Sequence, residues 1–112
     1  MTWQVMSRAS FAEVLAQPEV PFLLLDIRTK EQFDTVHVQG SQHCDSLNLR
    51  AFADQAARNT PFILICRRGI SSRHAAMWFD QLGFSAIHTL DGGVEGLQQH
   101  MTDVLITTEK EV

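Results

Sequence analysis

The sequence is poor in cysteine, with only two among its 112 residues. Two cysteines are too few for a disulfide scaffold, so we expect a reducing, cytoplasmic setting. Long apolar runs are also missing, and none approaches the roughly 18 residues that cross a bilayer. The first four residues lack the charged and apolar regions of a signal peptide. Neither export nor a membrane partner is therefore expected.

Positive charge is scarce as well, because 13 acidic residues outnumber 9 Lys and Arg and give a net charge of −4. That balance argues against a general nucleic-acid binder. The length suits one hydrophobic core but not two, and the chain has no internal repeat, low-complexity segment or interdomain linker. We predict a single domain over residues 1–106, followed by a flexible tail over residues 107–112.

Strand and helix patterns alternate along the chain. Apolar runs at residues 22–25 and 62–65 are typical of buried strands, residues 85–90 are expected to form a further strand, and residues 2–6 can add a short one. Helices are expected up to about residue 17 and over residues 29–35, 46–58, 75–82 and 93–97. From residue 102 the pattern loses periodicity, although residues 104–106 can pack onto a neighbour. Strands and helices alternating in this way predict a three-layer α/β domain with a mainly parallel sheet.

Cys66 occupies the junction between one of these strands and the next helix. The apolar run 62–65 leads directly into it, and Arg67, Arg68 and Gly69 follow. Ser71 or Ser72 can cap the helix. Gly83 is a suitable residue to end that helix.

Several features favour the thiolate form of Cys66. A helix N-terminus carries partial positive charge, and a tight loop of small residues can aim more backbone N–H groups inward. Arg67, Arg68 and Arg73 add positive charge, and no acidic residue lies between Cys66 and Met77. A cysteine that closes an apolar strand can also be an inert buried residue. The glycine, serines, arginines and helix start together favour a nucleophile prepared for an anionic substrate.

The segment Cys66-Arg67-Arg68-Gly69-Ile70-Ser71-Ser72 resembles the active-site loop of rhodanese-type sulfurtransferases. Residues 24–33 and 37–40 resemble the first signature of that family, and residues 90–97 resemble its closing one. The three pieces stand in the family's order and span nearly the whole chain, and the likeness is greatest to single-domain bacterial thiosulfate sulfurtransferases. The resemblance implies a three-layer rhodanese-like domain, with a five-stranded, mainly parallel sheet and helices on both faces.

The resemblance also implies the chemistry. The Cys66 thiolate attacks the outer sulfur of thiosulfate and holds it as a persulfide, and cyanide, a thiol or an acceptor protein then collects the sulfur. The backbone N–H groups of the loop from Arg67 to Ser72, Gly69 and Ile70 included, are expected to stabilise the persulfide. Arg67 and Arg68 are expected to attract the donor, although solvated side chains remain an alternative. No cofactor and no metal is expected to take part.

Supporting roles are expected for residues near the loop. Asp26 and Arg28 follow a strand at the same sheet edge as Cys66. An ion pair or backbone hydrogen bonds that tie down the loop are the favoured role for both, and a supporting effect on the site is the alternative. Arg73 is placed beside them in a supporting role. The hydroxyls of Ser71 and Ser72 can donate to the cysteine sulfur as an alternative to capping the helix.

Two further residues carry open alternatives. His37 can be a proton donor, but a histidine packed beneath a loop is the favoured interpretation. Cys44 can attack a persulfide or form a disulfide with Cys66, although its neighbours do not make it acidic as the loop does for Cys66. We favour a cysteine without a redox role.

Two rival functions stay open. Cysteine phosphatases and arsenate reductases offer an oxyanion cup, and the phosphatases carry C-x5-R. Here six residues separate Cys66 from Arg73, and Ser72 occupies the arginine position. The second rival is a domain that carries sulfur or binds a protein partner without turnover.

Overall fold

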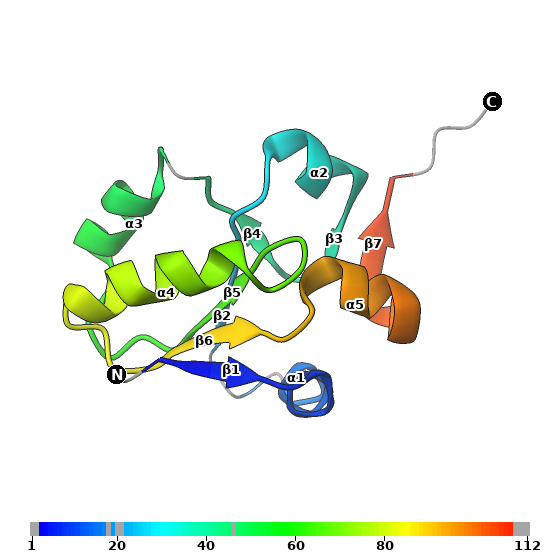
Figure 1. Cartoon of the computed structure of the whole chain (residues 1–112), viewed down its shortest axis with the longest axis horizontal. Coiled ribbons are helices and arrows are strands. Elements are labelled where there is room, and N and C mark those ends of the chain that lie inside the picture. The colour runs from blue at the N-terminus through cyan, green and yellow to red at the C-terminus, as the bar shows by residue number, and fades with distance from the viewer. Residues whose placement is uncertain (1–2, 18, 20–21, 46, 109–112) are drawn as a thin grey trace.

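A computed structural model describes residues 3–17, 19, 22–45 and 47–108 of the chain. Strands and helices alternate along most of it, as the sequence pattern predicts, but two consecutive short strands at residues 36–38 and 42–43 are not among the expected elements (Figure 1). The elements are β1 Gln4–Met6, α1 Arg8–Leu15, β2 Leu23–Asp26, α2 Lys30–Thr35, β3 Val36–Val38, β4 Gln42–His43, α3 Leu49–Gln55, β5 Phe62–Ile65, α4 Ser71–Gln81, β6 Ile87–Leu90, α5 Gly93–His100, the short 3-10 helix η1 Thr102–Val104 and β7 Leu105–Thr107.

Five strands form one sheet in the order β1-β6-β5-β2-β4, and every neighbouring pair is parallel. All four residues of the central strand β5 are buried. Leu64 of that strand stands opposite Leu25 of β2, and Ile65 stands opposite Asp26. The five-stranded parallel sheet predicted by the resemblance is therefore confirmed.

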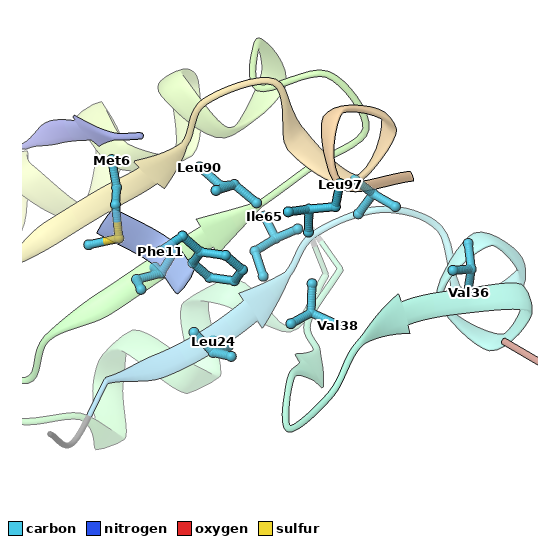
Figure 2. Close-up of a cluster of buried hydrophobic side chains, with 10 residues drawn as sticks. Met6, Phe11, Leu24, Val36, Val38, Ile65, Leu90 and Leu97 are labelled. Carbon is cyan, nitrogen blue, oxygen red and sulfur yellow. The ribbon is translucent and has the colours of Figure 1, made fainter. Parts of the chain in front are cut away.

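Helices cover both faces of the sheet. Successive side chains of β5 point to opposite sides, so this strand contacts both helical layers. Ile63 and Ile65 belong to a core cluster with Phe11 of α1 and Leu97 of α5. Figure 2 shows this cluster gathered between the sheet and the two helices. Phe62 and Leu64 belong to a second cluster, whose helical members Ala53, Ala76 and Phe79 come from α3 and α4. The sheet between these two layers fixes the position of Cys66, which directly follows β5.

A second, two-stranded sheet involves the end of the chain. β7 pairs antiparallel with β3, and Leu105 stands opposite Val38. The predicted packing of residues 104–106 onto a neighbouring segment is therefore found. The tail expected over residues 107–112 begins with Thr107 inside β7 and Thr108, whose N–H donates to the Thr35 carbonyl at 3.0 Å. Residues 109–112 lie outside the described part of the chain.

Some helix boundaries differ from expectation. The helix expected over residues 46–58 is shorter and runs over Leu49–Gln55. The residue before α4 is Ile70, so neither Ser71 nor Ser72 is its N-cap, and that expectation is wrong. Gly83 does follow the end of α4, with a φ of 93°. No helix within the described residues combines the length and hydropathy needed to span a bilayer.

Candidate active site

Cys66 follows β5 directly and opens the loop that leads into α4. The carboxyl ends of parallel strands form the functional edge of such sheets. Cys66 is only 3% exposed, and its neighbours Arg67 and Arg68 are exposed. The loop therefore presents charged side chains to solvent and keeps its sulfur inside.

Three polar groups surround the Cys66 Sγ atom. The backbone N–H of Gly69 donates to it at 3.1 Å, and the N–H of Ser72 donates at 3.4 Å. The Ser72 Oγ atom lies 3.3 Å from the sulfur, and this hydroxyl donates when the sulfur is a thiolate. Two amides and a hydroxyl aimed at one atom form a site for a sulfur anion.

Ser72 explains why the predicted serine cap is missing. Its side chain is fully buried and points to the sulfur, so it cannot cap the helix in solvent. Ser71, by contrast, is exposed and lines a surface hollow. Of the two serine hydroxyls predicted as donors to Cys66, the structure places only that of Ser72 at the sulfur.

The segment after β6 supports the loop from behind. The N–H of Val94 donates to the Cys66 carbonyl at 3.0 Å, and the N–H of Glu95 donates to the Arg67 carbonyl at 3.0 Å. Gly93 has a φ of 58°, and a Cβ atom there would lie 2.4 Å from the Cys66 carbonyl oxygen. A Cβ atom on Gly69 would lie 2.9 Å from the Leu90 carbonyl oxygen. Glycine at both positions lets two backbone segments pack directly against each other.

Sequence reasoning missed one charged residue of the site. Glu95 lies in the first turn of α5, and its Oε2 is 2.6 Å from Arg67 Nε. Its Oε1 is 3.7 Å from Arg68 Nε. The loop itself contains no acidic residue. The fold supplies one from residues 90–97, the segment in which the sequence indicates only a motif similar to the family's closing signature.

The outer side of the loop borders a hollow of about 280 Å³. Its lining residues are Arg67, Arg68, Ile70 and Ser71. Ile70 is 62% exposed, so the hollow has both apolar and cationic walls. Arg73, which was expected in a supporting role, donates through its Nε to the Gly69 carbonyl at 3.1 Å and so holds the loop.

Asp26 and Arg28 form the expected ion pair. Asp26 is fully buried, and its Oδ2 lies 2.7 Å from Arg28 Nη2, which also donates to the Val36 carbonyl. Among the described residues, the hydrogen bonds and ion pairs of these two side chains do not reach Cys66. Ile27, the residue between Asp26 and Arg28, donates its N–H to the Ile65 carbonyl at 2.9 Å. The pair thus anchors the strand end beside the loop and acts on the site only through that strand.

Cys44 is a buried free cysteine of the core cluster that contains Phe79. Burial, and then the negative charge of Asp45, raise the pKa of the Cys44 thiol above its ordinary value. A thiol held in its neutral form is a poor nucleophile. This environment supports the interpretation in which Cys44 has no redox role.

His37 is packed rather than free. Its Nδ1 lies 2.8 Å from the Phe33 carbonyl oxygen, and its ring stacks on the Phe33 ring with centroids 4.0 Å apart. No three His, Cys, Asp or Glu side chains of the described residues gather in a way that could hold a metal ion.

A cysteine in an amide-lined loop, at the carboxyl edge of a five-stranded parallel sheet, defines an α/β protein with a candidate cysteine nucleophile. The rhodanese-like domain matches residues 7–100, so the chain belongs to the rhodanese-like family.

Curated relatives agree with this membership. Over 72 residues the chain is 39% identical to thiosulfate sulfurtransferase GlpE of Pseudomonas aeruginosa, a match that covers 64% of the chain and 66% of the relative. The match therefore spans just under two thirds of that relative's length. With the protein of the same name from Tolumonas auensis, identity is 32% over 91 residues, which is 80% of the chain and 86% of the relative.

Solved structures share the fold at lower identity. A rhodanese-related protein of Thermoplasma volcanium superimposes with a TM-score of 0.74 at 20% identity, covering 88% of this chain and 93% of that one. The yeast protein Ygr203w, a protein tyrosine phosphatase of the Rhodanese family, gives a TM-score of 0.75 at 14% identity, covering 94% of this chain and 92% of that one. At these identities the likeness concerns the fold alone.

Proposed function

We propose that this protein is a sulfurtransferase that moves a sulfane sulfur from thiosulfate, or a similar donor, to cyanide or a thiol through a persulfide on Cys66. The observation that carries the proposal is the pair of backbone N–H groups, from Gly69 and Ser72, that converge on the Cys66 sulfur. The names of the curated relatives support the same activity. We expect the reaction to occur in a reducing, cytoplasmic setting, where an acceptor protein can replace the small thiol.

The first half-reaction loads the enzyme. The Cys66 thiolate attacks the outer sulfur of thiosulfate, a new S–S bond forms, and the S–S bond of the donor breaks. The electron pair of the broken bond leaves with sulfite, and the persulfide keeps one negative charge. The second half-reaction reverses the roles: cyanide attacks the outer sulfur, thiocyanate leaves, and the electron pair of the S–S bond returns to Cys66.

The loop residues have distinct tasks in this sequence. The N–H groups of Gly69 and Ser72 and the Ser72 hydroxyl stabilise negative charge on sulfur before and after each transfer. Arg67 and Arg68, which line the hollow beside Ser71, attract the dianionic donor and hold its sulfonate group. Ile70 and Ser71 shape the wall against which donor and acceptor lie.

An intact-mass experiment tests the proposal. Incubation with thiosulfate should add about 32 Da, the mass of one sulfur atom, and cyanide should remove it and yield thiocyanate. The cycle should repeat, with ping-pong kinetics. Cys66→Ser should abolish loading, and Cys44→Ser should retain most of it. A chain that never gains this mass from thiosulfate contradicts the proposed donor, whereas loading without repeated turnover indicates a sulfur carrier.

Phosphate-ester chemistry is the second candidate, because two solved structures with this fold are described as a tyrosine phosphatase or a possible one. The loop argues against it here. Ser72 occupies the arginine position of C-x5-R and contacts the sulfur, and Arg73 Nε is bonded to the Gly69 carbonyl. Hydrolysis of a phosphate ester without any loading from thiosulfate would reverse this order.

A further inference from the structure

Glu95 is the only acidic side chain whose contacts with the arginines of the active-site loop are seen among the described residues. One carboxylate oxygen contacts Arg67 Nε at 2.6 Å, and the other lies 3.7 Å from Arg68 Nε. Both contacts are made through the Nε atoms of the arginines. Two positive charges and one negative charge thus lie together beside the hollow at the loop, which we call the active-site entrance.

The backbone fixes the position from which the Glu95 side chain extends. The N–H of Glu95 donates to the Arg67 carbonyl at 3.0 Å, and the preceding N–H, of Val94, donates to the Cys66 carbonyl at 3.0 Å. Val94 and Glu95 are therefore hydrogen-bonded to the two peptide groups that follow Cys66 and Arg67. An anionic ligand that approaches Cys66 meets the field of this carboxylate whichever way the arginine side chains turn.

We propose that Glu95 is a specificity-determining residue that lowers the positive charge of the active-site entrance and so limits how strongly the site favours highly charged anions. For thiosulfate this inference rests on the proposed function. It applies equally to any charged reagent that reaches the Cys66 sulfur. The same carboxylate speeds the departure of an anionic product, since it weakens the attraction that such a product feels.

The opposite role would be to organise the arginines for ligand binding. The exposure of the side chains decides between the two, because those of Arg67 and Arg68 are 59% exposed and that of Glu95 is 37% exposed. Ion pairs so open to solvent restrain their partners weakly. The field of a full charge extends over a Debye length of about 8 Å at physiological ionic strength. The field effect is therefore the larger one, and it must grow with the charge of the ligand.

Alkylation of Cys66 measures this dependence without any sulfur transfer. Neutral iodoacetamide and monoanionic iodoacetate are reacted with the wild-type protein and with Glu95→Gln, and modification of Cys66 is followed by peptide mass. We expect the iodoacetate-to-iodoacetamide rate ratio to rise about two- to threefold in Glu95→Gln, and the rate of loading from dianionic thiosulfate to rise about fivefold. Both increases in rate should become roughly severalfold smaller in 0.5 M salt, because salt screens the field of the carboxylate.

Two controls separate charge from structure. Glu95→Asp keeps the charge and should keep the wild-type ratio. Asp54→Asn removes an exposed acid paired with Arg50 at 3.4 Å on α3 and should leave the ratio unchanged. An unchanged ratio in Glu95→Gln overturns the proposal, and a lower ratio shows instead that Glu95 organises the arginines. If the ratio rises but even the wild-type protein is not loaded by thiosulfate, the charge role stands and the proposed sulfur donor is wrong.

Discussion

Gly93 presses its backbone against the carbonyl group of Cys66, with no room for a side chain between them. A Cβ atom on Gly93 would lie 2.4 Å from that oxygen and 2.6 Å from the Arg67 carbonyl carbon. All of these atoms belong to the main chain, so the clash cannot be relieved by rotating a side chain. Cys66 is thus positioned by a glycine that is distant from it in the sequence.

Gly93→Ala is therefore expected to lower the free energy of unfolding by about 2–4 kcal/mol, through backbone strain and a displaced loop. Loading of Cys66 from thiosulfate should fall with it. Gly40→Ala is the matched control, because Gly40 also has a positive φ of 85° but nothing lies within 4 Å of its added Cβ. That variant should lose only about 1 kcal/mol in urea unfolding. Equal losses in the two variants would show that the close contact with Cys66 has no effect of its own.

Ser72→Ala removes the hydroxyl that lies 3.3 Å from the Cys66 sulfur. We expect the rate of persulfide loading to fall about 10- to 100-fold, since one donor to the charged sulfur is lost while the two amides remain. Ser85→Ala alters an exposed serine outside the loop and should change the rate less than about twofold. Quenched-flow loading followed by intact mass measures both. Similar rates for the two variants would contradict the role assigned to the Ser72 hydroxyl.

Asp26→Asn removes the negative charge of a side chain that is 0% exposed. The positive charge of Arg28 is then buried without its partner. Breaking a buried pair in this way is expected to lower the free energy of unfolding by about 3 kcal/mol. Asp34→Asn breaks a surface pair with Lys30, in which the side chains are 66% and 56% exposed, and should change stability by less than about 0.5 kcal/mol. Urea denaturation of both variants checks the difference. A small loss at Asp26 would mean that the β2 end does not depend on this pair.

The raised pKa of the Cys44 thiol predicts how the free energy of unfolding changes at alkaline pH. Because its pKa is raised by burial and then by Asp45, the unfolded chain releases this proton at a lower pH than the folded chain does. The stability that it contributes is complete below the ordinary thiol pKa of about 8.5 and is lost as the pH rises through the folded value. Cys44→Ala should therefore show a shallower decline in unfolding free energy above about pH 8.5. Parallel declines in variant and wild type, measured in urea with reductant present, would refute this linkage.

The sequence allowed the sheet to be predicted because its signals are local. The apolar runs that became β2 and β5 are continuous, as buried parallel strands require, and each is followed by a helix. The loop was predictable for the same reason, since Cys66, Gly69 and Ser72 lie within one short segment. Their contacts depend mainly on the backbone path of that segment.

Contacts between distant segments could not be predicted in this way. Nothing in the loop indicates that Glu95, from a later helix, neutralises part of its positive charge. The serine cap failed because propensity describes a solvent-exposed helix end, whereas here the fold turns Ser72 toward a buried sulfur. The pairing of β7 with β3 was visible only as a short apolar stretch without a partner.

The position of β1 at the edge of the sheet has a consequence for biosynthesis. Its Gln4 pairs with His88 of β6, so β1 leaves the ribosome well before the strand that becomes its hydrogen-bonded neighbour. Such distant pairing slows folding and prolongs the exposure of an unpaired edge. A nascent chain stalled before β6 emerges should therefore remain sensitive to proteases at its N-terminal end, and become resistant only once synthesis passes that strand.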